Sequence, residues 1–310
     1  MKIVYMGTPD FAVPALEMLV ESGHDVSLVV TKPDRPQKRG NKVLSSPVKM
    51  KALGLGIPVS QPEQVKGSMD FFNQITDVAP DLIVVAAYGK ILPVDILDIP
   101  ALGSINIHAS ILPKYRGSAP IHRAIENGES VTGVTLMYMS EGMDEGDIID
   151  TAMTEVDHKN TGQLHDELAK LGAVLLRDRL ADIESGQITR IPQDNNNASY
   201  ASMVEKEDAH VDFSKSGLDI ERLVRAMTPF PGAYAMLGEK KMKIVEAKMG
   251  TPVHGGIPGE IVKVGDDGIV VKAGDENTVV ITKLRMPGKK AMDTASFLRG
   301  NKLETGQQLR

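Results

Sequence analysis

The chain has 310 residues, which at roughly 100–200 residues per domain indicates two domains. Its 42% hydrophobic and 25% charged residues, with a net charge of −6, exclude a disordered or fibrous protein and argue against one that coats nucleic acid. It contains no cysteine, which excludes disulfides, thiolate metal sites and cysteine nucleophiles and fits a reducing, cytoplasmic compartment.

Short apolar segments alternate with helical patterns over the first 110 residues. The predicted strands are Lys2–Met6, Asp25–Val30, Ile57–Ser60, Asp81–Ala87 and Gly103–His108. Their apolar runs are continuous, which is typical of strands buried on both faces of a parallel sheet. Helical spacing between strands, as in 11–20, indicates crossover helices. The pattern predicts an α/β fold with a doubly wound, mostly parallel, Rossmann-like sheet.

The second half begins with two further strands, 131–139 and 147–154, and a long helix over Thr161–Glu184 with Thr161 as its expected N-cap. A polar stretch near 190–206 has the composition of a linker. Beyond one helix at 218–227, short β segments are predicted at 242–247, 259–264, 268–273 and 278–284. We therefore expect domains at 1–206 and 207–310, the second a small OB-like β-barrel.

The first turn argues against a dinucleotide cofactor. Met6-Gly7-Thr8-Pro9-Asp10 follows the first strand with one glycine and a proline, where dinucleotide folds have G-x-G-x-x-G. Close approach of the backbone to a pyrophosphate is therefore not provided.

Polar residues end the fifth strand. Asn106 and His108 are two residues apart, so they share one face at the carboxyl end of a strand, where open α/β sheets bind ligands. An amide can donate to a developing oxyanion and an imidazole can exchange a proton near neutral pH, which suits acyl transfer. Because neither is a nucleophile, the transfer would be direct. The alternative is a polar strand end without catalysis.

An acidic loop at 140–147 offers a third group. Asp144 could reach His108 and fix its tautomer and charge, or the segment could be only an acidic hairpin loop. Neither an EF-hand spacing nor a cluster of histidines is present, so no metal site is expected.

Positive charge is concentrated in two places. Residues 31–51 hold seven basic side chains against one acidic one, and residues 207–310 hold 16 against 14, whereas residues 1–206 hold 19 against 27. Both regions suit a polyanionic partner. No apolar run is long enough to span a membrane, and the N-terminus does not read as a signal peptide.

Taken together, these motifs resemble a known family. Asn106-x-His108-x-Ser110, Leu112-Pro113 and the later Met143-Asp144-x-Gly146-Asp147 are similar to the signature of the folate-dependent formyltransferases. The string from Ser110 to Ile121, with the opening 6–12 and the element 31–36, resembles the methionyl-tRNA branch of that family. The resemblance extends over nearly the whole chain, including the C-terminal barrel.

The resemblance implies a reaction and its site. The formyl group of 10-formyltetrahydrofolate would pass to the α-amino group of methionine on initiator methionyl-tRNA, by direct attack and a tetrahedral intermediate, for translation initiation. It implies Asn106, His108 and Asp144 as the catalytic set. The implied folate contacts are Ser110, Ile111, Leu112, Pro113, Tyr88, Gly89 and Ile91. The basic insertion loop 32–49 would contact the tRNA through Arg39, Lys38 and Lys42, and we expect a monomer.

Two alternative functions are weighed against this one. Another folate-dependent formyltransferase, or a formyltetrahydrofolate hydrolase, would use the same amide, imidazole and carboxylate, but a small substrate requires neither the basic loop nor the barrel. A tRNA-binding protein without catalysis would lack one of the three groups, and all three are present. Whether His108 acts as a base or stabilises an oxyanion is left open by the sequence.

Overall fold

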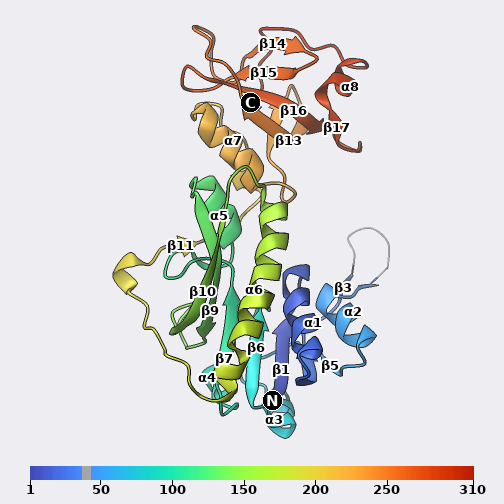
Figure 1. Ribbon diagram of the computed structural model, residues 1–310. Coiled ribbons are helices and arrows are strands. Elements are labelled where there is room, and N and C mark those ends of the chain that lie inside the picture. Colours follow the sequence, from blue (N-terminus) through green and yellow to red (C-terminus); the bar gives the residue numbers. More distant parts are fainter. Residues whose placement is uncertain (37–42) are drawn as a thin grey trace. The chain divides into compact units, whose positions relative to one another are not determined.

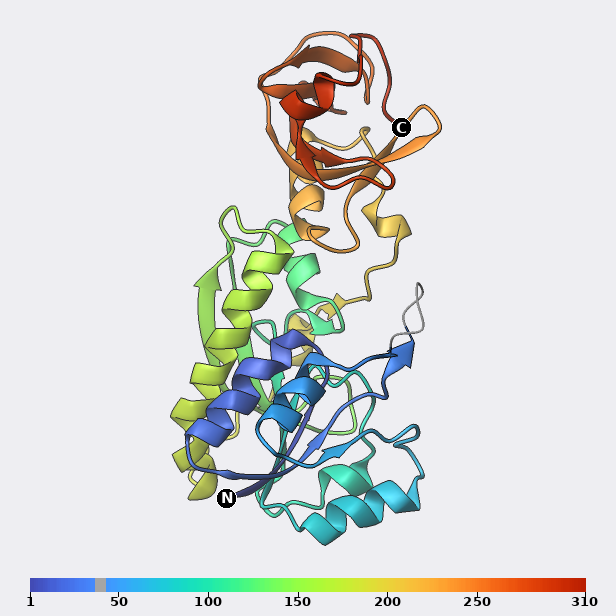
Figure 2. The same ribbon diagram turned by 90° about the vertical axis from the view of Figure 1, so that its right-hand side faces the viewer.

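The computed structural model describes residues 1–36 and 43–310, and these form two compact units. The first unit consists of residues 1–120, 131–155 and 165–202. The second consists of residues 121–130, 156–164 and 203–310. Figures 1 and 2 show the chain in two views, coloured along the sequence.

A seven-stranded sheet forms the centre of the first unit. Its order is β10-β9-β7-β6-β1-β2-β5. The strands are β1 (Lys2–Gly7), β2 (Asp25–Val30), β5 (Val59–Ser60), β6 (Leu82–Ala86), β7 (Ser104–His108), β9 (Val131–Tyr138) and β10 (Ile148–Glu155). From β5 to β7 all neighbours are parallel, whereas β9 and β10 run antiparallel at one edge. The predicted mostly parallel α/β sheet is confirmed.

Helices cover both faces of this sheet (Figure 1). On one face α6 (Thr161–Glu184) packs so closely that a Cβ on Gly172 would lie 2.7 Å from Ile107, and α1 (Val13–Glu21) lies on the same side (Figure 2). On the other face α3 (Met69–Val78) and α4 (Val94–Leu97) contribute to an apolar cluster with β1, β2 and β6. Asn106 and His108 alternate with Ile107, so they point to the α3 face.

Local side-chain bonds explain where helices begin. Ser46 caps α2 (Pro47–Gly54) and Ser68 caps α3, each hydroxyl accepting from a backbone N–H three residues on. The cap of α6 differs from the prediction. Asn160, not Thr161, accepts from the backbone of Gln163 at 3.0 Å, and the Gln163 side chain accepts from the Asn160 backbone at 3.0 Å. This reciprocal pair is a capping box, and Thr161 instead donates to the carbonyl of Ala226 at 2.6 Å.

The second unit is a curled antiparallel sheet with helices. The strand order is β12-β13-β16-β15-β14, with β17 beside β16. The elements are β12 (Tyr234–Leu237), β13 (Lys240–Met249), β14 (Ile261–Gly265), β15 (Gly268–Lys272), β16 (Thr278–Arg285), β17 (Met292–Asp293), α5 (Pro120–Glu126), α7 (Gly217–Ala226) and α8 (Thr294–Leu298). Leu309 bridges to Leu237 at one edge, and Gln308 bridges to Glu260 beside the other. The chain end therefore joins the two edges, as expected for a small barrel.

The polar stretch after α6 is bound to the first unit. β11 (Tyr200–Ala201) pairs in parallel with β8 (Arg116–Gly117), directly after the candidate site. A second two-stranded pair, β3 (Arg35–Pro36) and β4 (Val43–Leu44), flanks residues 37–42. The domain boundary at 206/207 remains a prediction. The second unit also includes residues 121–130 and 156–164, so the two units cannot be separated at one point in the chain.

Candidate active site

The site is built where β7 ends. Asn106 is half-buried, in register with Val85 of β6, and His108 is only 6% exposed. Within residues 1–36 and 43–310 the Asn106 side chain makes no hydrogen bond, so its N–H groups are available to a ligand. The side chain therefore meets the geometric requirement for a donor at the sheet edge.

His108 lies between two oxygen atoms. Its Nε2 is 2.9 Å from the carbonyl oxygen of Tyr115, and its Nδ1 is 3.6 Å from Oδ2 of Asp144. A carbonyl can only accept, so in the neutral ring the proton is assigned to Nε2 and Nδ1 is the basic nitrogen. The 3.6 Å separation is too long for a hydrogen bond but close enough for the carboxylate to act on the ring electrostatically.

The position of Asp144 is set by its backbone conformation and by a hydrogen bond to its carboxylate. Its φ of 54° lies in the left-handed region, which aspartate tolerates better than most residues. Oδ2 accepts from the backbone N–H of Gly117 at 2.8 Å. Gly117 has φ 111°, and a Cβ there would lie 2.9 Å from the carbonyl oxygen of Ala201, so the close approach requires glycine.

The segment 110–113 forms a turn against β9. The Ser110 hydroxyl, fully buried, donates to the carbonyl of Lys114 at 2.7 Å. Thr135 of β9 donates to the Ser110 carbonyl at 2.7 Å and accepts from the N–H of Leu112 at 3.1 Å. Leu112 is buried, whereas Ile111 and Pro113 are half-buried. The structure thus holds this apolar segment in a turn directly after His108 and uses the Ser110 hydroxyl within that turn.

The loop after β6 leaves the same edge of the sheet, because β6 and β7 are parallel neighbours. Its side chains differ sharply in exposure: Tyr88 is 1% exposed and Ile91 78% exposed. The Tyr88 ring belongs to the apolar core under α3 and α4, and burial raises the pKa of its hydroxyl to about 12. Gly89 is exposed with φ 74°. Ile91 is therefore open to a ligand, whereas the Lys32 ammonium lies beside Gly89, 2.2 Å from where a Cβ would stand, and Tyr88 supports the loop from beneath.

Two functional candidates were not predicted from the sequence. Arg116 and Gln193 lie behind the Asp144 loop, where Gln193 donates to the carbonyls of Asp144 and Gly146. Arginine is rarely buried, so nothing in the sequence singles out Arg116, and Gln193 falls in the stretch expected to be a linker. Lys38, Arg39 and Lys42 fall at 37–42, outside the described residues.

The described residues hold no metal site and no membrane span. Within 1–36 and 43–310, no group of three or more histidines and carboxylates is arranged to hold a metal ion. In the same ranges no helix has the length and apolarity to cross a membrane.

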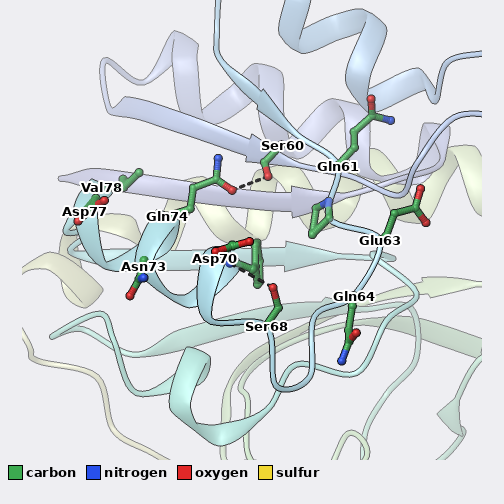
Figure 3. A pocket seen from close by; sticks show the side chains of 12 residues that line it. Ser60, Gln61, Glu63, Gln64, Ser68, Asp70, Asn73, Gln74, Asp77 and Val78 are labelled. Atoms are coloured by element: carbon green, nitrogen blue, oxygen red, sulfur yellow. Dashed lines mark hydrogen bonds between the residues drawn. The ribbon is translucent and has the colours of Figure 1, made fainter.

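A separate hollow of about 910 Å³ lies between the end of β5 and α3 (Figure 3). Its lining is polar, and its side chains serve local structure: Ser60 donates to Gln74 at 2.6 Å, and Ser68 caps α3. None of the predicted site residues lines it. This hollow is therefore separate from the candidate site at the end of β7.

Comparison with known proteins identifies the family of the chain and supports its fold. A family model described as formyl transferase matches residues 1–180, and one described as formyl transferase, C-terminal domain, matches residues 203–302. The methionyl-tRNA formyltransferase of Ruminiclostridium cellulolyticum is 45% identical over 100% of this chain and 99% of its own length. That of Acetivibrio thermocellus is 46% identical over 100% and 99%.

The fold also resembles a solved N-formyltransferase. The enzyme from Helicobacter canadensis, in complex with folinic acid and dTDP-3-aminofucose, superposes with a TM-score of 0.65. The match covers 91% of this chain and 98% of that one, at 20% identity. The chain belongs to the formyl transferase family, in the branch of the methionyl-tRNA formyltransferases.

Proposed function

We propose that this protein transfers the formyl group of 10-formyltetrahydrofolate to the α-amino group of methionine on initiator methionyl-tRNA. The observation that carries the proposal is the triad at the end of β7, in a chain 45% identical over its whole length to a methionyl-tRNA formyltransferase. Direct transfer fits the site, which offers an amide, an imidazole and a carboxylate but no activated nucleophile.

The roles follow from position and chemistry. 10-Formyltetrahydrofolate supplies an electrophilic formyl carbon. The free N–H groups of Asn106 are suited to stabilise negative charge that develops on the formyl oxygen. His108, with Nδ1 as its basic nitrogen, is suited to take up the proton that the attacking amine releases. Asp144, 3.6 Å from Nδ1, stabilises the imidazolium that results.

The residues present fit a folate at this edge. The flat pterin ring requires apolar contacts on its faces, and its polar edge requires hydrogen-bond partners such as backbone N–H and carbonyl groups. Ile91 supplies an exposed apolar side chain, Gly89 an exposed backbone position next to the Lys32 ammonium, and Ile111 and Pro113 half-buried apolar surface in the turn that follows His108. Ser110, Leu112 and Tyr88 are buried and are assigned to shaping these loops rather than to direct contact.

A basic face of the second unit supports a tRNA partner. Tyr234, Lys243 and Arg285 are in register across β12, β13 and β16, and Lys241 lies over the Tyr234 ring at 3.5 Å. Burial lowers the pKa of Lys243, and the charges of Arg285 and Lys241 lower it further. An anion would relieve this repulsion, so the row suits phosphates.

Two lysines of the basic segment 31–51 are engaged in ion pairs within the first unit. Lys49 is paired with Asp34 at 2.5 Å and Lys51 with Glu17, so these two stabilise the first unit. Contacts of Arg39, Lys38 and Lys42 with the tRNA remain predictions. We also propose a monomer in the cytoplasm, which light scattering and fractionation would test.

The test is a competition between acceptors. Enzyme with formyl-labelled 10-formyltetrahydrofolate is offered initiator methionyl-tRNA, elongator methionyl-tRNA, a dTDP-amino sugar and water. We expect label on the initiator methionyl-tRNA. Label on the sugar, or release of formate alone, would overturn the proposed acceptor.

A further inference from the structure

Arg116 is a buried cation, 1% exposed, immediately before the residue whose N–H binds Asp144. A buried guanidinium is tolerated only when its N–H groups have acceptors. Its Nε and one terminal nitrogen donate to Oε1 of Gln193 at 3.1 and 2.8 Å. The same terminal nitrogen donates to Asn195 at 2.8 Å, and the other lies 3.4 Å from a carboxylate oxygen of Glu145.

Gln193, which accepts from Arg116, also donates to the acidic loop. Its Nε2 donates to the carbonyl of Asp144 at 2.9 Å and to that of Gly146 at 2.7 Å. Both ends of the amide are thus used, oxygen toward Arg116 and nitrogen toward the loop. A flipped amide would set donors against Arg116 and its oxygen against two carbonyls, so the orientation is fixed.

The residue held in this way is strained and chemically important. Asp144 has φ 54°, and left-handed backbone in a residue other than glycine persists only when its surroundings determine it. Two side-chain donors on the carbonyls of Asp144 and Gly146 provide that determination. They leave the Asp144 carboxylate on the Gly117 N–H at 2.8 Å and toward His108.

We propose that Gln193, oriented by buried Arg116, is a positioning residue that holds Asp144 against His108. The inference rests on the proposed function for its catalytic consequence. Gln193 does not reach the reacting atoms itself; it acts through the backbone of residues 144–146.

Gln193→Glu separates positioning from folding. The carboxylate keeps the size and the acceptors for Arg116 but removes both donors to the loop and brings an anion near two carbonyl oxygens. We expect kcat for formyl transfer to fall about 10–100-fold, the size of effect known for residues that orient a catalytic group. The KM values for folate and tRNA should stay within about twofold. Gln187→Glu, the same change at an exposed position of this unit, should match the wild type.

A double-mutant cycle tests the route of the effect. If Gln193 acts through the Asp144 carboxylate, adding Gln193→Glu to Asp144→Asn should slow the enzyme no further. The inference would be overturned if the double variant lost as much kcat as the product of the two single losses, or if Gln193→Glu alone kept a normal kcat.

Hydrogen exchange gives a readout independent of activity. In Gln193→Glu the amide of Gly117 should exchange at least tenfold faster, while β7 and β9 keep their protection. Unchanged exchange at Gly117 would contradict the inference. If the wild type transfers no formyl group, the proposed function fails, and the exchange result alone decides whether Gln193 fixes the loop.

Discussion

Nδ1 of His108 lies 3.6 Å from Oδ2 of Asp144, although 36 positions separate them in the chain. The contact joins the end of β7 to the loop between β9 and β10, although β9 runs antiparallel to β7 and ends beside its start, where the N–H of Met139 donates to the carbonyl of Ser104. The loop therefore has to return along β7 to bring Asp144 to His108. The same carboxylate oxygen accepts from Gly117, so the loop is fixed to the segment that follows β7.

Removing the charge of Asp144 should slow the reaction while preserving the fold. In Asp144→Asn the amide oxygen can still accept from Gly117, but the stabilisation of a protonated His108 is lost. We expect kcat to fall about 10²-fold, within the range for general acid–base groups. The matched control is Glu141→Gln, which removes an exposed charge from the same loop. A normal kcat in Asp144→Asn would exclude an electrostatic role.

Gly146 controls the position of the loop. A Cβ there would lie 1.9 Å from the carbonyl oxygen of Tyr138, so Gly146→Ala must displace the loop. We expect the free energy of unfolding to fall by about 1–3 kcal/mol, as in other overpacked sites, and kcat to fall with it. Denaturant titration measures the free energy of unfolding. Gly54→Ala, whose Cβ would meet nothing within 4 Å, should be stable, and equal losses in both variants would contradict this account.

The sheet was predictable and the support of the site was not. Continuous apolar runs identified β1, β2, β6 and β7, because strands buried on both faces need them. Asn106 and His108 followed from strand periodicity, since they stand on the same face. The role of Gln193 depends on pairing between β8 and β11, which are more than 80 positions apart and only two residues long. No local pattern encodes such a contact.

Local composition did not predict the surroundings of two polar segments. Tyr88 is adjacent to exposed Gly89, yet its ring turns into the core, because the chain direction at a loop decides which side chains reach solvent. The stretch 190–206 is polar and resembles a linker, but its amide side chains are needed as acceptors for buried Arg116. The polarity of this stretch therefore reflects both its exposure to solvent and its hydrogen bonds to a buried cation.

The basic row on β13 and β16 should bind tRNA electrostatically. Lys243→Gln and Arg285→Gln should each weaken tRNA binding and reduce the slope of log K against log salt by about 0.7–0.9 for each phosphate that is no longer neutralised. Turnover at saturating tRNA should not change. Lys263→Gln, an exposed change on β14, serves as the control. An unchanged salt slope in both test variants would remove this face from the interface.

The pair Asp208–Arg123 should make the second unit sensitive to acid. The two side chains are 2.7 Å apart, and the hydrogen bond from Arg123 lowers the pKa of Asp208. A carboxyl with a lowered folded pKa stabilises the fold above its unfolded pKa of about 4, and this is lost as pH falls through the folded value. Asp208→Asn should therefore lower Tm at about pH 6–7, and the difference from the wild type should shrink below about pH 4. Glu207→Gln is the control, and a Tm difference independent of pH would contradict the assignment.

The most direct measurement is the single-turnover rate of formyl transfer to initiator methionyl-tRNA by Asn106→Ala, with enzyme in excess over both substrates. Loss of a hydrogen-bond donor to the developing oxyanion should slow this step about 10²–10³-fold. The affinities for folate and tRNA, measured by titration, should not change. A rate close to that of the wild type would remove Asn106 from the mechanism and contradict the assignment of the oxyanion site at the end of β7.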